Sequence, residues 1–193
     1  MSNEDIEHGE PLNIIEAELL QNRVIIWNPK DGSRLYKEGF YGKPLGIRKP
    51  KTPEFDRPLE LSFFETLYLL EKKRIVLKDS KTGNKIEPNE FKEIAMKLHE
   101  GFKEKYLVYS DLREKYVVRP GLKFGAVFAV YEHGPGIDHA PFIVHVLPSS
   151  EEISAIEMVR AGRLATTVRK KFVIATINMD NTISYYIFSW FKP

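Results

Sequence analysis

Three residues in the second half of this 193-residue chain carry side chains that could together cleave RNA. Tyr131 ends an apolar segment, His139 lies in the loop after it, and Lys170 belongs to a basic turn before another apolar segment. If a 2′-hydroxyl attacks the adjacent phosphate, it must lose a proton, the 5′-oxygen must gain one, and a cation must stabilise the phosphorane. A tyrosine, a histidine and a lysine at one place could supply these functions without a metal ion.

Each residue of this set also has an ordinary structural interpretation. An unperturbed histidine titrates near pH ~6.5 and suits a general acid, but His139 could equally be a loop residue without a role. His133 and His145 compete with it. The reference pKa of tyrosine is ~10, so Tyr131 could act as a base only beside a cation. A half-buried tyrosine at the end of a strand is the alternative.

The basic turn 169–171 contains two lysines, and we expect only one of them to face the site. Neighbouring residues of a strand point to opposite faces, so Lys170 and Lys171 are alternatives rather than a pair. Arg169 and Lys171 also suit the C-terminal end of the helix that we expect before them, because cations complement the helix dipole there.

The composition excludes several kinds of protein and site. The apolar fraction of 42% suffices for a packed core, and a net charge of +2 with a pI near 8.6 neither requires nor excludes a nucleic-acid partner. A chain without cysteine has no disulfides, thiolate metal ligands or cysteine nucleophile. We expect a cytoplasmic protein without a membrane span, since there is no secretory signal and no apolar run of ~18 residues.

The C-terminal half also has no metal-binding signature. It contains no pair of histidines at helical spacing and no carboxylate cluster at ligand spacing. Asp138 and Glu151 could be assigned to a magnesium site, but no motif links them. We therefore expect neither a metal nor a cofactor.

Hydrophobic periodicity predicts two α/β halves, residues 1–104 and 105–193. In the first half we expect a short helix (12–20), a strand (24–27) and a turn (28–32), and then a helix that a capping box of Ser62 and Glu65 opens and that runs to residue 70. A strand (74–77), a turn (79–83) and a long helix with one apolar stripe (88–104) follow. In the second half we expect a helix (106–113), strands (116–118, 128–131, 142–147, 172–178, 182–190) and a helix opened by Ser149 and Glu152 (to 166), the last two strands forming a hairpin.

A proline-rich basic stretch over residues 41–59 interrupts this pattern. It contains four prolines, at positions 44, 50, 53 and 58, and proline removes backbone donors and fixes φ. Its cations include Lys43, Arg48, Lys49 and Lys51. We expect a long exposed loop, which is either functional or a solvated insertion.

Several motifs of the second half resemble those of the archaeal tRNA-splicing endonucleases. They are YLVYSDLR at 106–113, VVRPGLKFG at 117–125, VYE at 130–132, His139 before FIVHV at 142–146, and RLA at 163–165 followed by VRKK at 168–171. The resemblance is looser over residues 12–104, where it rests on the order of elements. It implies a mixed α/β (α+β) fold, in which a small N-terminal domain precedes a C-terminal restriction-endonuclease-like catalytic domain with a mixed central sheet.

The resemblance also implies a reaction and a set of site residues. The family cleaves precursor tRNA at a bulge-helix-bulge without metal or cofactor, leaving a 2′,3′-cyclic phosphate and a 5′-hydroxyl. Tyr131, His139 and Lys170 stand at the positions of its catalytic residues. Arg163 stands where an arginine stacks on a bulge nucleotide, and Tyr185, or more loosely Trp190, stands where a second residue of the last strand grips it.

One departure from the family pattern follows the histidine. Ala140 and Pro141 follow His139, where the family usually has serine, and the loop before it is compact. These differences affect the contacts that orient His139 and remove no catalytic group.

The resemblance further implies an assembly, because a bulge-helix-bulge has two cleavage sites and this chain has one catalytic set. The family assembles through its final strands and through an acidic loop that enters a basic pocket of another subunit. Here that loop, residues 178–181, has Asp180 as its one carboxylate. We therefore expect two catalytic chains with two structural chains, with a homotetramer as the alternative. We also expect Lys43, Arg48, Lys49 or Lys51 to contact RNA phosphates.

Two other functions stay open at this point. The chain could be a non-catalytic RNA-binding or scaffolding subunit of the same complex, although the presence of Tyr131, His139 and Lys170 argues against it. It could also be a metal-dependent DNA nuclease of related architecture. Activity in a chelator, and a requirement for the substrate 2′-hydroxyl, would separate these possibilities.

Overall fold

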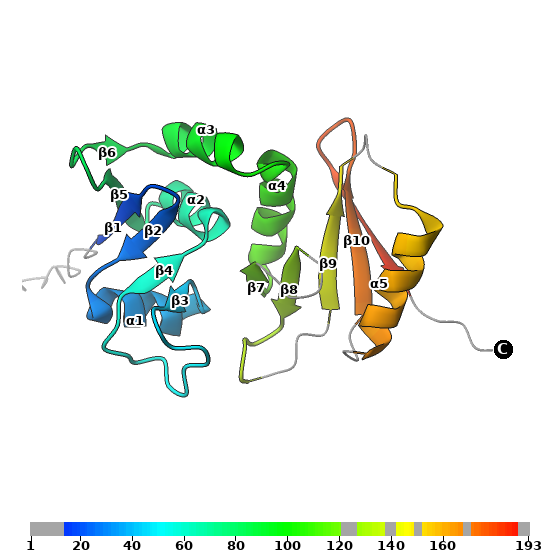
Figure 1. Ribbon diagram of the computed structural model, residues 1–193, viewed down its shortest axis with the longest axis horizontal. Coiled ribbons are helices and arrows are strands. Elements are labelled where there is room, and N and C mark those ends of the chain that lie inside the picture. Colours follow the sequence, from blue (N-terminus) through cyan, green and yellow to red (C-terminus); the bar gives the residue numbers. More distant parts are fainter. Residues whose placement is uncertain (1–13, 121–126, 138–141, 149–151, 168–170, 189–193) are drawn as a thin grey trace, which may run out of the picture.

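Two mixed β-sheets lie side by side in the computed structural model, with helices packed around them (Figure 1). The structure describes residues 14–120, 127–137, 142–148, 152–167 and 171–188. The first sheet has the strand order β3-β4-β2-β1-β5-β6, and the second has the order β11-β10-β9-β8-β7. Each contains one parallel pair, β1 with β5 and β9 with β10, among antiparallel pairs. The predicted mixed α/β class is therefore confirmed.

The first sheet and its helices come from the N-terminal part of the chain. Its strands are β1 (Ile15–Leu20), β2 (Arg23–Ile26), β3 (Lys43–Pro44), β4 (Leu59–Leu61), β5 (Ile75–Asp79) and β6 (Lys85–Ile86). Its helices are α1 (Pro29–Gly39), α2 (Phe63–Glu71) and α3 (Pro88–Leu98).

The second sheet has one helix packed on each face. Its strands are β7 (Val117–Pro120), β8 (Phe128–Tyr131), β9 (Phe142–Leu147), β10 (Lys171–Ile177) and β11 (Ile183–Phe188), and its helices are α4 (Phe102–Arg113) and α5 (Ala155–Thr167). Val144 and Val173 face α4 and belong to a core cluster that also includes residues of the first sheet. Ile143 and Phe172 point to the other face and pack with Ile153, just before α5.

Two predictions for the start of the chain are wrong. Residues 15–20 form strand β1, in which Ile15, Ala17 and Leu19 are buried and alternate with more exposed residues. The pairing of β1 with both β2 and β5 decides this, because tertiary pairing outweighs weak local preference. Residues 28–32 do not form a free turn, because the Asn28 side chain accepts a hydrogen bond from the Lys30 amide and caps helix α1, with Pro29 as its first residue.

Two predicted helices have different bounds. The long helix from Pro88 is two helices, because residues 99–101 break it and Gly101 has a φ of 63°. Its apolar stripe continues across the break through Phe102 and Tyr106 of α4. The last helix begins at Ala155, later than the capping box predicted, since residues 152–154 are not helical; Ser149 lies outside the described residues.

The remaining predicted elements of the described chain are confirmed within one to three residues. These are strands β2, β5, β7, β8, β9, β10 and β11 and helix α2, and β10 and β11 pair as an antiparallel hairpin. The basic stretch 41–59 is mostly irregular, with short strands β3 and β4 near its two ends. Hydrogen bonds from the Leu45 amide to the Pro58 carbonyl and from the Ile47 amide to the Pro44 carbonyl close its base.

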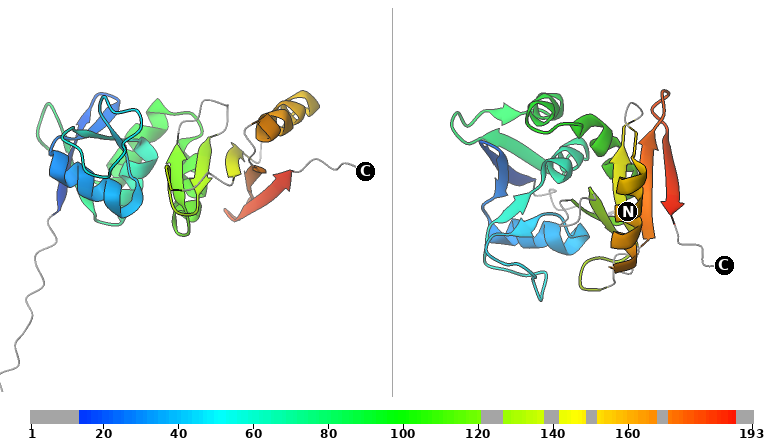
Figure 2. Two further views of the ribbon diagram at one scale, coloured as in Figure 1. Left: turned by 90° about the horizontal axis from the view of Figure 1, so that it is seen from below. Right: turned by 45° about the vertical axis from the view of Figure 1, so that its right-hand side comes forward.

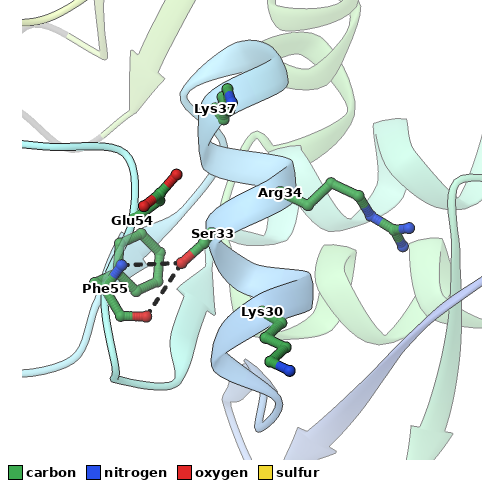
Figure 3. A pocket seen from close by; sticks show the side chains of 6 residues that line it. All are labelled: Lys30, Ser33, Arg34, Lys37, Glu54 and Phe55. Atoms are coloured by element: carbon green, nitrogen blue, oxygen red, sulfur yellow. Dashed lines mark hydrogen bonds between the residues drawn. The ribbon is translucent and has the colours of Figure 1, made fainter.

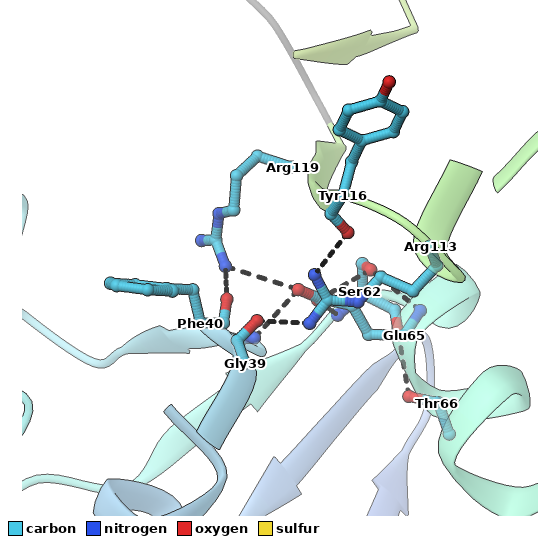
Figure 4. Close-up of polar contacts among 9 residues, drawn as sticks. Gly39, Phe40, Ser62, Glu65, Thr66, Arg113, Tyr116 and Arg119 are labelled. Atoms are coloured by element: carbon cyan, nitrogen blue, oxygen red, sulfur yellow. Dashed lines mark hydrogen bonds and ion pairs between the residues drawn. The ribbon is translucent and has the colours of Figure 1, made fainter. Parts of the chain in front are cut away.

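Glu65 connects the capping box of α2 to both sheets (Figure 4). Its side chain, in a residue that is 2% exposed, accepts hydrogen bonds from the Ser62 amide and hydroxyl and from the Gly42 amide, each at 2.8 Å. Arg119 of β7 approaches the same carboxylate at 3.3 Å. A buried carboxylate with several donors and one cation is well compensated, so its removal leaves those donors without a partner.

We expect Glu65→Ala to lower the free energy of unfolding by about 3–5 kcal/mol, the usual cost of removing one member of a buried ion pair. Urea denaturation at neutral pH would measure it. Glu93→Ala, at an exposed position in the middle of α3, is the matched control and should cost less than about 0.5 kcal/mol. Equal losses for the two variants would contradict the role assigned to Glu65.

Candidate active site

Three neighbouring strands of the second sheet end or begin at one edge. Val130 near the end of β8 pairs with Phe142 at the start of β9, and Phe142 pairs with Lys171 at the start of β10. Strands in a sheet are about 4.8 Å apart, so these three positions lie within about 10 Å. Tyr131 is the last residue of β8 at this edge. In the sequence, His139 comes three residues before the start of β9, and Lys170 comes directly before the start of β10.

Among the predicted catalytic residues, Tyr131 falls within the part of the chain that the structure describes. It is partly buried, is the last residue of β8 and lies opposite Val117 of β7. His139 and Lys170 lie outside the described residues, as does Trp190. The roles of all three catalytic residues therefore stay predictions, supported by the strand register around them.

Helix α1 of the first sheet contributes to the surroundings of Tyr131. Burial raises the pKa of Tyr36 on this helix, the Arg119 guanidinium lowers it, and the Tyr131 phenol raises it again. Tyr36 also packs edge-on against Phe40 and Phe55, with ring centroids 5.4 and 5.8 Å apart. Residues before the second sheet are thus part of the environment of the candidate base, a relation that the motifs do not indicate.

The loop after Tyr131 begins with a tight turn. The Ile137 amide donates a hydrogen bond to the Gly134 carbonyl at 3.1 Å, and Gly134 is buried with a φ of 131°. Phe40, the residue that ends helix α1, lies directly against Gly134. Residues from the two sheets therefore meet in the loop that leads to His139.

The competing residues occupy other kinds of position. His145 is partly buried in the middle of β9, and its ring lies 6.4 Å from that of Phe172, as expected of a packing histidine. His133 is exposed in the loop after β8. Lys171 is the exposed first residue of β10.

Arg163 and Tyr185 lie on opposite faces of the second sheet. Arg163 is exposed on α5, which packs on the face that includes Phe172 and Phe188. Tyr185 is 37% exposed and donates a 2.6 Å hydrogen bond to Asp111 of α4, on the other face. Burial and this carboxylate raise the pKa of Tyr185. Arg163 and Tyr185 are thus attached to different layers of the catalytic half, α5 for Arg163 and the α4 side for Tyr185.

The cations of the basic stretch 41–59 are exposed. Lys43 lies in β3, which pairs with β4 at the edge of the first sheet, and Arg48, Lys49 and Lys51 follow in the irregular part. This stretch stays connected to α1, because the Ser33 hydroxyl donates to the Phe55 carbonyl at 3.1 Å and accepts from the Phe55 amide at 3.0 Å (Figure 3).

Helix α1 adds cations that the sequence interpretation missed. Lys30, Arg34 and Lys37 lie along it, and together with Ser33, Glu54 and Phe55 they line a hollow of about 650 Å³ (Figure 3). Arg34 also pairs with Asp31 at 3.4 Å. The signal was present in the sequence, since an Asn-Pro helix start followed by cations four and three residues apart places them on one side of a helix.

The loop between β10 and β11 is organised by its own side chains. Asp180 accepts hydrogen bonds from the Thr182 amide at 3.0 Å and hydroxyl at 2.6 Å, which lower its pKa. Asn178 donates from its side-chain amide to Thr182 and Ser184. The carboxylate is ionised at neutral pH and exposed at the tip of the hairpin.

The described residues contain neither a metal-binding cluster nor a membrane-spanning helix. Among the described residues, there is no group of three or more histidine, aspartate or glutamate side chains that could hold a metal ion. No helix in the described ranges is both long and apolar enough to cross a membrane.

Comparison with known proteins gives matches over nearly the whole chain. Residues 15–92 match the N-terminal domain of the tRNA intron endonucleases, and residues 102–185 match their catalytic C-terminal domain. A tRNA-splicing endonuclease of Hyperthermus butylicus is 47% identical over 93% of this chain and all of its own length. Those of Sulfolobus acidocaldarius and Saccharolobus islandicus are 42% and 41% identical, also over 93% of the chain and over 99% and 100% of their own lengths.

Proposed function

Because this chain belongs to the tRNA intron endonuclease family, we propose that it cleaves precursor tRNA at bulge-helix-bulge intron boundaries without a metal ion. The products are a 2′,3′-cyclic phosphate and a 5′-hydroxyl. The tRNA-splicing endonuclease function follows from the family, whereas the metal-free reaction, its products and the bulge-helix-bulge substrate are proposals. The observation that supports the proposed reaction is the register of β8, β9 and β10, which brings Val130, Phe142 and Lys171 to one edge. Val130 precedes Tyr131, Lys171 follows Lys170, and Phe142 comes three residues after His139.

Each catalytic residue has one role in this proposal. Tyr131 removes the proton of the 2′-hydroxyl or orients it, and the charge of Lys170 favours the phenolate that this requires. His139 donates a proton to the leaving 5′-oxygen. Lys170 stabilises the phosphorane as a point charge, and Arg163 stacks on a bulge nucleotide, whose unpaired base exposes its face.

The proposed assembly contains two copies of this chain and two structural chains, with a homo-oligomer as the alternative. Two cleavage sites need two catalytic sets. The hairpin loop 178–181 has one carboxylate, Asp180, which its own turn already engages through Thr182. With a single carboxylate, that loop is poorly suited to enter a basic pocket on a second copy of this chain. Tyr185, which donates a hydrogen bond to Asp111 on the α4 side of the sheet, is the candidate to grip the bulge opposite an Arg163 of another catalytic chain.

The proposal also includes the division of the chain into domains and its location in the cell. The chain divides into an N-terminal domain, residues 1–104, and a catalytic domain, residues 105–193. Its location is cytoplasmic, since precursor tRNA is an intracellular substrate. The rival function, a non-catalytic subunit of the same complex, would leave Tyr131, His139 and Lys170 without a purpose.

We expect the basic stretch to contact RNA phosphates. Replacing Lys43, Arg48, Lys49 and Lys51 together by alanine should weaken binding of a bulge-helix-bulge RNA and reduce the slope of log Kd against log salt by about 3. This follows because each lost phosphate contact lowers the slope by about 0.7 on single strands. Binding titrations between 50 and 200 mM salt, on the order of the physiological range, would measure it.

A control with the same loss of charge separates local contact from net charge. Lys81, Lys92, Lys97 and Lys103 lie on the β5–β6 turn, α3 and α4, away from the basic stretch (Figure 1). Their combined replacement by alanine should change the slope by less than about 1. If both variants lower the slope equally, the basic stretch has no specific role.

The direct test of function is cleavage of a bulge-helix-bulge RNA in EDTA by the purified chain, alone and with a candidate structural subunit. Cleavage only with the partner supports the heteromeric enzyme. Cleavage by the chain alone supports the chemistry and overturns the two-plus-two assembly. Cleavage that requires added magnesium, or none under any pairing, overturns the proposed chemistry.

A further inference from the structure

Phe40 ends helix α1 in an unusual backbone conformation. Its φ is 55°, in the left-handed region that non-glycine residues rarely adopt, and its amide donates a 2.7 Å hydrogen bond to the Tyr36 carbonyl. Such a conformation persists where the surroundings fix it. Here the contacts of residues 39–42 fix it.

Side chains of three elements bind the backbone of residues 39–42 (Figure 4). Arg113 of α4 donates to the Gly39 carbonyl, and Arg119 of β7 donates to the Phe40 carbonyl. The Gly42 amide donates to Glu65 of α2. This short segment of the first half is thereby attached to the strand β7, which lies directly beside β8.

The ring of Phe40 lies on the backbone of the loop that follows Tyr131. A Cβ placed on Gly134 would come within 2.7 Å of three ring carbons of Phe40, so any other residue there would displace the ring. The φ of Gly134, 131°, independently favours glycine. By contrast, a Cβ on Gly136, two residues later, would meet nothing within 4 Å. The contact is therefore specific to Gly134.

We propose that Phe40 is a positioning residue of the active site: its ring, held by Arg113 and Arg119 through the backbone, fixes the start of the loop after Tyr131, residues 132–137, which precedes His139 in the chain. The inference rests on the proposed function, because it assigns His139 the proton transfer. It gives the N-terminal half an indirect part in catalysis, through the position of the loop, beyond binding RNA. A displacement of a reacting group by about 1 Å can cost on the order of 100-fold in rate.

The test uses single-turnover cleavage of a bulge-helix-bulge RNA by the full chain in its active assembly. Phe40→Ala should slow cleavage at saturating RNA by about 10–100-fold and change the Kd for RNA by less than about twofold. Phe40→Leu keeps an apolar group and should recover part of the rate. In a His139→Ala background, Phe40→Ala should have no further effect, because the positioned group is already gone.

Phe55→Ala is the matched control. Phe55 belongs to the same aromatic cluster around Tyr36 and is also partly buried, but Phe40 is the ring that lies against Gly134. Its removal should leave the saturating rate within about twofold. An unchanged rate in both Phe40 variants, or an equal loss from Phe40→Ala with and without His139, would overturn the inference. If instead His139→Ala itself leaves cleavage intact, it is the proposed function that fails.

Discussion

His139→Ala should lower the rate of the cleavage step by about 10²–10⁴-fold, the usual contribution of a positioned general acid. RNA binding should change little, since the proton is transferred in the transition state and not in the ground state. Single-turnover kinetics at saturating RNA, with Kd measured separately, would show the two effects. The limb of the wild-type pH–rate profile on which the rate falls as the acid loses its proton should be absent in the variant.

A change of leaving group tests the role of His139 more sharply than the loss of rate. An RNA with sulfur in place of the bridging 5′-oxygen has a leaving group that needs no proton. On this substrate the defect of His139→Ala should shrink by about tenfold or more. His133→Ala and His145→Ala are the matched controls and should cleave both substrates at near wild-type rates. An undiminished defect on the sulfur substrate would contradict the assignment of His139 as the acid.

Lys170→Met should lower the cleavage rate by about 10²–10³-fold, because removal of one charged or hydrogen-bonding group from an anionic transition state has an effect of this size. Methionine keeps the length of the side chain and removes its charge. The same single-turnover measurement applies, and the Kd should rise only slightly. Since the proposed phenolate of Tyr131 depends on this cation, the variant should also cleave faster as the pH rises.

Lys171→Met provides a control one residue away. Lys171 is exposed at the start of β10, and neighbouring residues of a strand point to opposite faces, so we expect only one of the two lysines to face the site. The Lys171→Met variant should keep the wild-type rate within a few-fold. A larger loss from Lys171→Met than from Lys170→Met would mean that the catalytic lysine has been assigned to the wrong residue.

The second sheet could be predicted well from the sequence, because its strands are short apolar runs between clear turns. The segments 128–131 and 142–147 of the sequence coincide with β8 and β9, and the hairpin of β10 and β11 follows from the turn 179–181. The relative positions of Tyr131, His139 and Lys170 were predicted from motifs. That Val130, Phe142 and Lys171 meet at one edge depends on the strand register, a long-range property that local patterns do not contain.

The first half was predicted less well, for physical reasons that differ between elements. Strand β1 is short and apolar, and only its pairing with β2 and β5 distinguishes it from a helix. Helix α1 begins at an Asn-Pro pair that occurs equally in turns, and its Gly32 and Gly39 argue against a helix. In the structure Gly32 packs closely against Leu59, which accounts for a glycine inside the helix.

The site residues missed by the sequence interpretation depend on contacts between the halves. Phe40 is separated from Gly134 by about half of the chain, and no motif connects them. The attachment of residues 39–42 by Arg113 and Arg119 likewise joins segments more than 70 residues apart. Such contacts appear only once both sheets are assembled.

In the proposed reaction the RNA 2′-hydroxyl is the nucleophile, and Tyr131, His139 and Lys170 act without a metal ion. The most direct measurement is the structure of the product ends formed in EDTA from two substrates, one all-ribose and one with a single 2′-deoxy nucleotide at the cleavage site. A 2′,3′-cyclic phosphate and a 5′-hydroxyl from the first substrate, with no cleavage of the second, is the predicted result. Cleavage of the 2′-deoxy substrate, or a 5′-phosphate product, would contradict it.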